Sequence, residues 1–229
     1  MNFRITPLLT LLAQCIARAN ILALDFCLGA LISTYVVRAM HKGASWQTML
    51  IGGILGVLPD FLDYFTQPLS KWIRGREYDH HLLPTHWPLL MIPVAGTFSW
   101  IHTHDCTWVY ISCGALGSHY VHDMIGRYSG VRLLAPISFK YFGTNGIEEP
   151  HHSKRARYMR SHSTQQWIDA YWMRPSTLCM TELALAFVCS VVLVCTQPEG
   201  VWVFALSILS FLGLGFCLQI TRRLELGYS

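Results

Sequence analysis

The chain has 229 residues and a formal net charge of +4, and 52% of its residues are hydrophobic while only 13% are charged. Soluble domains average about 25% charged residues, so the composition argues against an ordinary soluble enzyme and indicates a membrane protein. The sequence contains no phosphate-cradling glycine loop, no nucleophile elbow and no C-x-x-C pair. These absences argue against ATP-driven chemistry, serine-hydrolase chemistry and a structural zinc knuckle.

Apolar segments along the chain predict an all-α fold, a multi-pass transmembrane helical bundle, because lipid tolerates no unpaired backbone groups. Residues 1–19 carry an apolar run but no small-x-small cleavage site, so we expect an interfacial lead-in instead of a signal peptide. Six candidate spans follow, at residues 20–40, 47–65, 86–101, 107–123, 178–196 and 201–220. The last of these contains no charged residue and matches the roughly 20 residues that a bilayer span needs.

We expect a single membrane domain over residues 1–229. After the lead-in, residues 20–123 would form a four-span core that contains a metal site. Residues 124–177 would form a cytoplasmic loop region, and residues 178–220 would form two C-terminal transmembrane helices.

The distribution of Lys and Arg predicts the orientation of this bundle. The short connections are residues 41–45, 102–106 and 196–200, and the long ones are residues 66–85 and 124–177. If the spans alternate, the short connections share one side, and the long connections share the other side with both termini. Fifteen of the seventeen Lys and Arg residues fall on the long-connection side, and only Arg38 and Lys42 lie elsewhere. The positive-inside rule therefore places the long connections and both termini in the cytoplasm.

Metal-ligand side chains cluster at the predicted cytoplasmic ends of three apolar segments. They are Asp60, Asp63, His81, His86, His119 and Asp123. Ionisable groups beside a bilayer are costly and indicate a functional site by default. Because three segments deliver such residues to one side, we predict a metal site at the cytoplasmic helix ends. Mixed His and Asp ligation without thiolate favours zinc, with manganese or iron as alternatives.

The spacing of these residues predicts how they share the site. His119 and Asp123 are four residues apart, which puts both side chains on one helix face, one turn apart. His122 lies three residues after His119, and it would either face the site or support it from behind. We predict His119 and Asp123 as the platform on which the metal is bound.

The other two segments contain prolines beside their candidate ligands. Asp60 and Asp63 are three residues apart and share a helix face, and Pro59 predicts a helix break or a first-turn proline just before them. Pro84 lies between the two histidines of the third segment and predicts a turn there. Thr85, in the same turn, would hydrogen-bond a ligand or a bound water and fix its orientation.

A divalent ion lowers the pKa of a bound water and screens charge on a phosphoryl or acyl oxygen. We therefore expect a metal-activated water to attack a phosphorus or carbonyl centre. The expected catalytic residues are Asp60, Asp63 and Thr85, with either aspartate as general base where it is not a ligand. Candidate contacts for an anionic headgroup are Arg127, Arg132 and Lys140, for which ordinary positive-inside anchoring is the alternative.

The order of these motifs resembles the YdjM-like family of bacterial inner-membrane proteins, described as membrane-bound metal-dependent hydrolases. The matching pieces are L-P-D at 58–60, H-x-x-x-T-H at 81–86, S-H-x-x-x-D at 118–123 and G-V-x-L-L-x-P at 130–136. The resemblance covers roughly residues 52–142. It implies a location in the cell inner membrane, if the source is bacterial, with the metal site on the cytoplasmic side.

The same resemblance implies a substrate class, because the family is thought similar to the zinc-dependent phospholipase C superfamily. That similarity implies a phosphoester or lipid-like substrate, by analogy. The chain departs from the family pattern at Leu82 and Trp87, where the family commonly has Arg and Ser. It also places Asp63 three residues after Asp60, where the family's usual interval is two. Leu82 removes a cation that could bind phosphate.

Two alternatives to a hydrolase remain open at this point. The first is a non-catalytic scaffold or transporter with a structural metal. The second is a membrane di-iron oxygenase or desaturase, because three histidine groups faintly resemble histidine boxes. These groups are His81 with His86, His119 with His122, and His151 with His152.

The expected partners are the lipid bilayer and a lipid or phosphoester substrate. A basic run at residues 151–163 includes an aromatic residue, a pattern also found in nucleic-acid-binding segments. Beside a membrane, such a run is expected to lie on anionic lipid headgroups, so no nucleic-acid partner is expected. The sequence leaves the oligomeric state open.

Overall fold

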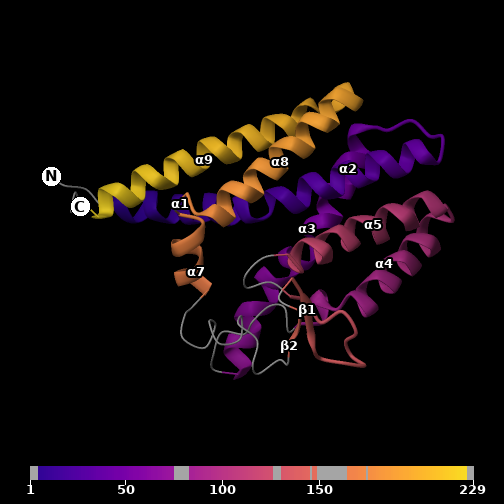
Figure 1. Cartoon of the computed structure of the whole chain (residues 1–229), viewed down its shortest axis with the longest axis horizontal. Coiled ribbons are helices and arrows are strands. Elements are labelled where there is room, and N and C mark those ends of the chain that lie inside the picture. Colours follow the sequence, from indigo (N-terminus) through magenta and orange to yellow (C-terminus); the bar gives the residue numbers. More distant parts are fainter. Residues whose placement is uncertain are drawn as a thin grey trace. The chain divides into compact units, whose positions relative to one another are not determined.

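The computed structural model confirms the all-α fold class. It describes residues 5–74, 83–125, 130–144, 146–148, 164–173 and 175–225. Contacts divide the chain into two compact units, of which the first comprises Met1–Leu24 with Thr164–Ser229 and the second comprises Asp25–Ser163. Figure 1 labels the helices and strands of both.

The first unit packs the N-terminal helix against the C-terminal helices. Its elements are α1 (Ile5–Ile21), α7 (Thr164–Tyr171), α8 (Thr177–Thr196), the 3-10 turn η3 (Pro198–Gly200) and α9 (Val201–Glu225). The core contains Ala13 and Ala17 of α1, Leu183 of α8 and Cys217 of α9, together with Trp172, all at most 1% exposed. The small residues of α1 let α9 approach closely along its length.

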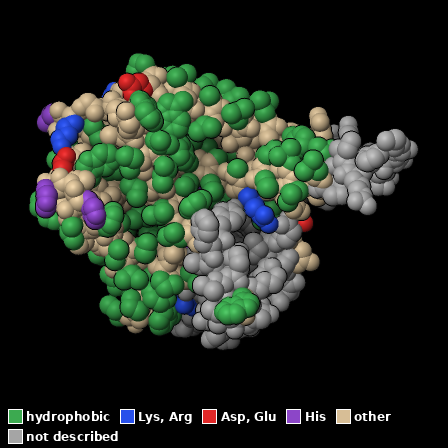
Figure 2. Space-filling model, turned by 180° about the vertical axis from the view of Figure 1, so that it is seen from behind, with side chains coloured by type: hydrophobic (Ala, Val, Ile, Leu, Met, Phe, Trp, Pro, Cys, Tyr) green, Lys and Arg blue, Asp and Glu red, His purple; other side chains and the backbone are tan. Residues whose placement is uncertain are grey.

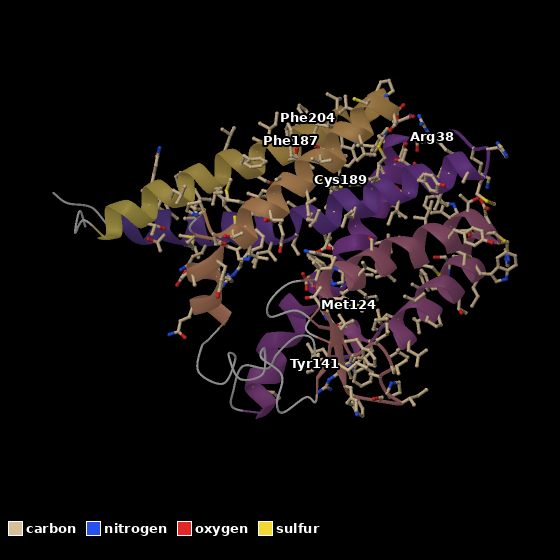
Figure 3. The ribbon with its side chains drawn as sticks, in the orientation of Figure 1. Arg38, Met124, Tyr141, Phe187, Cys189 and Phe204 are labelled. Atoms are coloured by element: carbon tan, nitrogen blue, oxygen red, sulfur yellow. The ribbon has the colours of Figure 1, made fainter. Side chains whose placement is uncertain are left out.

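Polar side chains also join the helices of this unit. The buried hydroxyls of Ser190 on α8 and Ser207 on α9 lie 2.9 Å apart. Asn20 of α1 donates a 3.2 Å hydrogen bond to the backbone carbonyl of Ser210 on α9. Beside the serine pair, the rings of Phe187 and Phe204 pack with centroids 5.4 Å apart (Figure 3). Hydrogen bonds between apolar helices are favoured where water is scarce. These two fix the register of α8 against α9 and of α1 against α9.

The second unit contains most of the predicted core. Its elements are α2 (Ala23–Ala39), α3 (Trp46–Arg74), the 3-10 turn η2 (Pro84–His86), α4 (Pro88–Thr103), α5 (Cys106–Asp123), β1 (Tyr141–Gly143) and β2 (Gly146–Glu148). Helix α5 packs against both α3 and α4, and η2 packs against α3 and α4. The site end of the unit is therefore enclosed by three helices and a short turn.

Glycines bring α2 and α3 into backbone contact. A Cβ atom added at Gly29 would collide with the backbone oxygen of Gly52 and lie 3.2 Å from Cα of Gly56. A Cβ added at Gly56 would collide with the backbone oxygen of Asp25. Glycines at such crossings let two helix backbones approach where any side chain would separate them. The crossing lies one helical turn from both Asp25 and Asp60, so it sets the distance between the backbones that carry these carboxylates.

The prediction of six spans is wrong in number. Within the residues that the structure describes, three helices are long and apolar enough to cross a membrane: Leu8–Ala39, Thr177–Thr196 and Pro198–Thr221. Trp46–Leu62 is apolar but shorter. The predicted third span has only the 16 residues of α4, and the predicted fourth, α5, ends in a polar turn with His119, His122 and Asp123. Insufficient length in α4 and in Trp46–Leu62, and polarity in α5, explain why fewer than six spans are found.

Apolar side chains cover much of the described surface, as Figure 2 shows for one face. Large exposed examples include Leu212 at 65%, Phe98 at 62% and Val188 at 56%. Exposed apolar side chains on this scale suit contact with lipid hydrocarbon.

The predicted helix break at Pro59 is also wrong, because α3 continues from Trp46 to Arg74 through this residue. Proline in a helix next to other helices is tolerated in membrane proteins, since neighbouring groups compensate for the lost backbone hydrogen bond. Asp60 therefore lies on a continuous helix, and its position depends on the packing of α3. The predicted turn around Pro84 is confirmed by the 3-10 turn η2.

A small hairpin follows α5, where only a loop region was predicted. Strands β1 and β2 are antiparallel, and Gly143 pairs with Gly146 across the turn. Val131 exchanges two backbone hydrogen bonds with Phe142 of β1, and Gly130 donates a 2.7 Å hydrogen bond to the carbonyl of Asp123. Gly130 has φ +145°, a conformation that side chains disfavour. These contacts tie the hairpin to the last turn of α5.

The opposite end of the second unit has an exposed ion pair between two short connections. Lys42, just after α2, pairs with Asp105, which also caps α5 by accepting a 2.9 Å hydrogen bond from the backbone N–H of Thr107. The bond from Lys42, and then the one from Thr107, lower the pKa of Asp105 to about 2. The connections at 41–45 and 102–106 therefore lie on the same side of this unit.

The glycine crossing gives a direct test of the packing in this unit. We expect Gly56→Ala to destabilise the protein by roughly 1–3 kcal/mol, because its methyl group would meet backbone atoms that have no rotamer to change. Gly117→Ala on α5 is the matched control, since a Cβ there meets nothing within 4 Å. That variant should be up to about 1 kcal/mol more stable, through helix propensity. Thermal unfolding in detergent measures the stability of both variants. An equal change in stability in the two would contradict the close contact between α2 and α3.

Candidate metal centre

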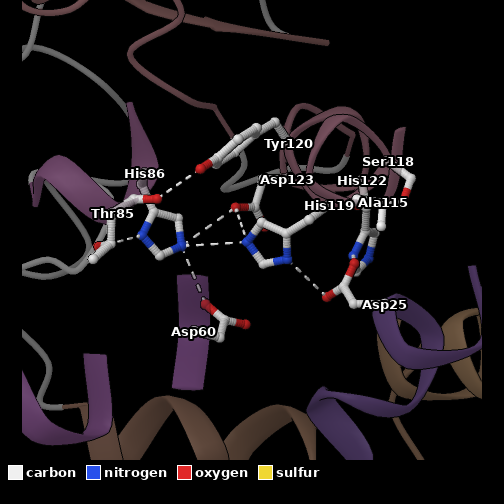
Figure 4. A network of polar contacts seen from close by, with 10 residues as sticks. All are labelled: Asp25, Asp60, Thr85, His86, Ala115, Ser118, His119, Tyr120, His122 and Asp123. Atoms are coloured by element: carbon white, nitrogen blue, oxygen red, sulfur yellow. Dashed lines mark hydrogen bonds and ion pairs between the residues drawn. The ribbon is translucent and has the colours of Figure 1, made fainter. Parts of the chain in front are cut away.

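Four predicted ligands meet at the site end of the second unit (Figure 4). Nε2 of His86 lies 3.4 Å from Nε2 of His119. Oδ1 of Asp60 lies 3.2 Å from Nε2 of His86. Oδ2 of Asp123 lies 3.3 Å from Nε2 of His119 and 3.7 Å from Nε2 of His86. Residues from α3, η2 and α5 thus direct two nitrogens and two oxygens at a common point.

These separations are those of atoms that share a metal ion. In a tetrahedral zinc site, bonds of about 2.0–2.1 Å place the ligand atoms roughly 3.3 Å from one another. Four of the separations between these atoms range from 3.2 to 3.7 Å. The ligand atoms of Asp60, His86 and His119 all lie within 4.8 Å of one another.

Burial and charge both fit a divalent ion. The side chains of His86 and His119 are 0% exposed, whereas those of Asp60 and Asp123 retain 17% and 14% exposure. Buried carboxylates require compensating charge, because an uncompensated ion in low dielectric is costly. Two neutral imidazoles, two carboxylates and one divalent ion form a neutral assembly. The exposed fraction of the carboxylates makes them the accessible part of the centre.

Local sequence explains how His86 is held in place. Pro84 begins the η2 turn and Pro88 begins α4, which are positions where proline costs no backbone hydrogen bond. The hydroxyl of Thr85 lies 3.2 Å from Nδ1 of His86, on the side of the ring away from the centre. Tyr120 of α5 donates a 2.7 Å hydrogen bond to the carbonyl of Thr85. The turn that carries His86 is therefore fixed to the helix that carries His119.

Helix α5 supplies the platform that the spacing predicted. His119 and Asp123 lie one turn apart on the same face, and both point at the centre. His122 lies beside them but faces α2, where its Nδ1 is 2.8 Å from Oδ1 of Asp25.

Asp25 is a residue of this site that was not among those predicted from the sequence. Its side chain is 2% exposed, and its second oxygen lies 3.4 Å from Nδ1 of His119. A signal was present, because Asp25 is the one acidic residue in the apolar run from 21 to 37. Ionisable residues inside such runs indicate function by default.

The structure places the remaining predicted residues as follows. The side chain of Asp63 lies outside the described residues, although its backbone belongs to α3; His81 and Arg127 lie outside them entirely. Lys140 is exposed, beside the hairpin. The structure thus brings together Asp60, Thr85, His86, His119 and Asp123.

Arg132 contacts two aromatic rings in the segment that follows α5. Its guanidinium carbon lies 5.2 Å from the centroid of Phe139 and 5.3 Å from that of Tyr141. Phe139 in turn packs on Trp87, the residue after His86, with ring centroids 5.6 Å apart. Cation–π contacts of this kind fix the plane of a guanidinium group without neutralising its charge.

Comparisons with known proteins agree with these observations. The sequence profile of the family described as YdjM inner membrane protein matches residues 23–223. No curated protein and no solved structure gives a significant match. The match includes every residue of the centre and most of the apolar helices. The chain therefore belongs to the YdjM inner membrane protein family.

Proposed function

We propose that this protein is a membrane-embedded, metal-dependent hydrolase that acts on a phosphoester or lipid-like substrate. The observation that carries the proposal is the convergence of Asp60, His86, His119 and Asp123 at ligand-like distances. When bound there, a divalent ion such as zinc supplies a water of lowered pKa and a Lewis acid for the bond that is broken.

We assign different tasks to the two carboxylates. Asp123 lies 3.3 and 3.7 Å from the two imidazole nitrogens and shares a helix face with His119, so it completes a three-residue ligand set with His86 and His119. Asp60 comes from another helix, with Oδ1 3.2 Å from Nε2 of His86 and its ligand atom within 4.8 Å of that of His119. It is therefore placed to accept a proton, as a general base next to the reacting water. Thr85 orients His86 through Nδ1.

Metal content separates these tasks. We expect wild-type protein purified in detergent to carry stoichiometric zinc or manganese, measured by plasma mass spectrometry. His119→Ala and Asp123→Asn should lose it, because each removes a ligand. Asp60→Asn should keep the metal and lose roughly 10²- to 10⁴-fold in turnover, the usual contribution of a general base.

His104→Ala is the matched control, since His104 follows α4 at the opposite end of the unit. Wild-type protein that binds no metal after reconstitution would contradict the hydrolase. Loss of metal in Asp60→Asn as well would make all four side chains ligands, and a closed site of that kind is structural.

The preference for an anionic substrate rests on Arg132. In the part of the chain that the structure describes, its buried Nε makes no hydrogen bond, while its charge is held in place between Phe139 and Tyr141. A fixed guanidinium group matches the geometry of phosphate oxygens. The resemblance to phospholipase C enzymes that the sequence motifs imply would favour the same substrate class, by analogy.

Arg132→Met tests this preference. Loss of a hydrogen bond to a charged group costs about 1.5–3 kcal/mol, so kcat/KM for a phosphodiester lipid in mixed micelles should fall on the order of 10- to 100-fold. Hydrolysis of an uncharged ester should change little. Lys140→Met is the control for general membrane anchoring, because Lys140 is exposed. An equal fall in kcat/KM in both variants would mean that Arg132 anchors the protein to the membrane and does not bind the substrate.

We also propose that the chain is multi-pass, with its centre on the cytoplasmic side. Fifteen of seventeen Lys and Arg residues lie outside the short connections and their flanks. The Lys42–Asp105 pair lies at the N-terminal end of α5, whereas the centre lies near its C-terminal end. The 18 residues of α5 span about 27 Å, so these features lie at opposite ends of the unit.

Cysteine labelling in intact spheroplasts tests the orientation. Cys106 is exposed beside Asp105, and we expect a variant that retains only this cysteine to react with a membrane-impermeant maleimide from outside. The matched control carries Lys140→Cys in a cysteine-free background and should react only after the membrane is opened. The reverse pattern would place the centre on the outer side.

A further inference from the structure

We propose that Asp25 is a positioning residue that fixes the orientation and the proton of His119 for metal binding. The inference rests on the proposed metal site and adds a residue that lies outside its ligand set. Asp25 belongs to α2, whereas the candidate ligands come from α3, η2 and α5. It would therefore make α2 a functional part of the centre.

The two nitrogens of His119 have separate partners. Nε2 faces His86 and Asp123 inside the centre, at 3.4 and 3.3 Å. Nδ1 faces outward, 3.4 Å from Oδ2 of Asp25, which is an ion-pair distance. A proton on Nδ1 is attracted to this carboxylate, and Nε2 is then left with the free electron pair that a metal needs. Asp25 thereby favours the tautomer of His119 that is able to bind metal.

His122 holds the same carboxylate from the other side. Its Nδ1 lies 2.8 Å from Oδ1 of Asp25, so the two oxygens serve two histidines of one helix. Each oxygen therefore has one partner, and the carboxylate cannot rotate toward one histidine without leaving the other. Figure 4 shows Asp25 between the two rings, away from Asp60. His122 is thus a support for Asp25, not a ligand.

The backbone keeps Asp25 in this position. Gly56 of α3 packs on the carbonyl of Asp25, and Gly29, one turn further along α2, packs on Gly52. A side chain that is 2% exposed and held on two sides has little freedom to move. That rigidity is what a residue needs to orient another side chain.

The geometry predicts weaker metal binding in Asp25→Asn, which keeps the shape of the side chain but removes its charge. The dissociation constant for zinc should rise about 10- to 100-fold, the usual effect of removing an outer partner of a ligating histidine. Competition with a chromophoric chelator in detergent measures it. Cobalt bound in place of zinc should show shifted visible absorption bands, because His119 becomes a weaker donor. A role in folding alone would leave those bands unchanged.

Asp105→Asn is the matched control, the same chemical change in the same unit at the other end of α5. It should retain wild-type affinity and spectrum. His122→Gln should raise the dissociation constant for zinc less than Asp25→Asn does, because the Asp25 carboxylate then loses only one of its two histidine partners. If Asp25→Asn does not fold, His122→Gln decides the question, and wild-type values in it would overturn the proposal.

Wild-type affinity and cobalt spectrum in a folded Asp25→Asn protein would overturn the role of Asp25 and leave the metal site intact. Wild-type protein that binds neither zinc nor cobalt would instead overturn the proposed function, and this inference with it. Metal binding by the wild-type protein therefore shows which of the two proposals has failed.

Discussion

The buried contact between His86 and His119 is the constraint on which the second unit depends. Two imidazole nitrogens lie 3.4 Å apart, and neither side chain has exposed surface. Polar groups in such a place need partners, because water cannot replace them. The partners come from four elements: Asp60 from α3, Asp123 from α5, Asp25 from α2, and Thr85 from the η2 turn. The fold of this unit can be understood as the scaffold that brings these partners together.

The two histidines are oriented alike, but the groups that contact their Nδ1 atoms differ. Each directs Nε2 inward and Nδ1 toward an oxygen, which is a hydroxyl for His86 and a carboxylate for His119. A carboxylate partner makes the histidine that it contacts a stronger metal ligand than a hydroxyl partner does. The two ligands are therefore expected to bind an ion with unequal strength, although they are buried to the same extent.

Much of the site could be predicted from sequence because it uses local patterns. The four-residue spacing of His119 and Asp123 requires only a helix, and Pro84 requires only a turn. The number of spans could not be predicted in the same way, because α4 and α5 are short or polar and depend on packing. Pro59 was misread because a neighbouring helix, which the sequence does not display, makes an unbroken α3 tolerable. The hairpin had a local signal, an Asn-Gly pair at 145–146, that the membrane interpretation obscured.

The contact of α2 with α3 through Gly29, Gly52 and Gly56 has a consequence for how such a centre could evolve. When side chains separate two helices, substitutions adjust the distance in small steps. Here main-chain atoms touch, so the spacing between the backbones of Asp25 and Asp60 is already at its lower limit and changes only by a large step. The contact of Asp25 with His119 must therefore be tuned through the identity of the side chain at position 25, not through a gradual shift of α2.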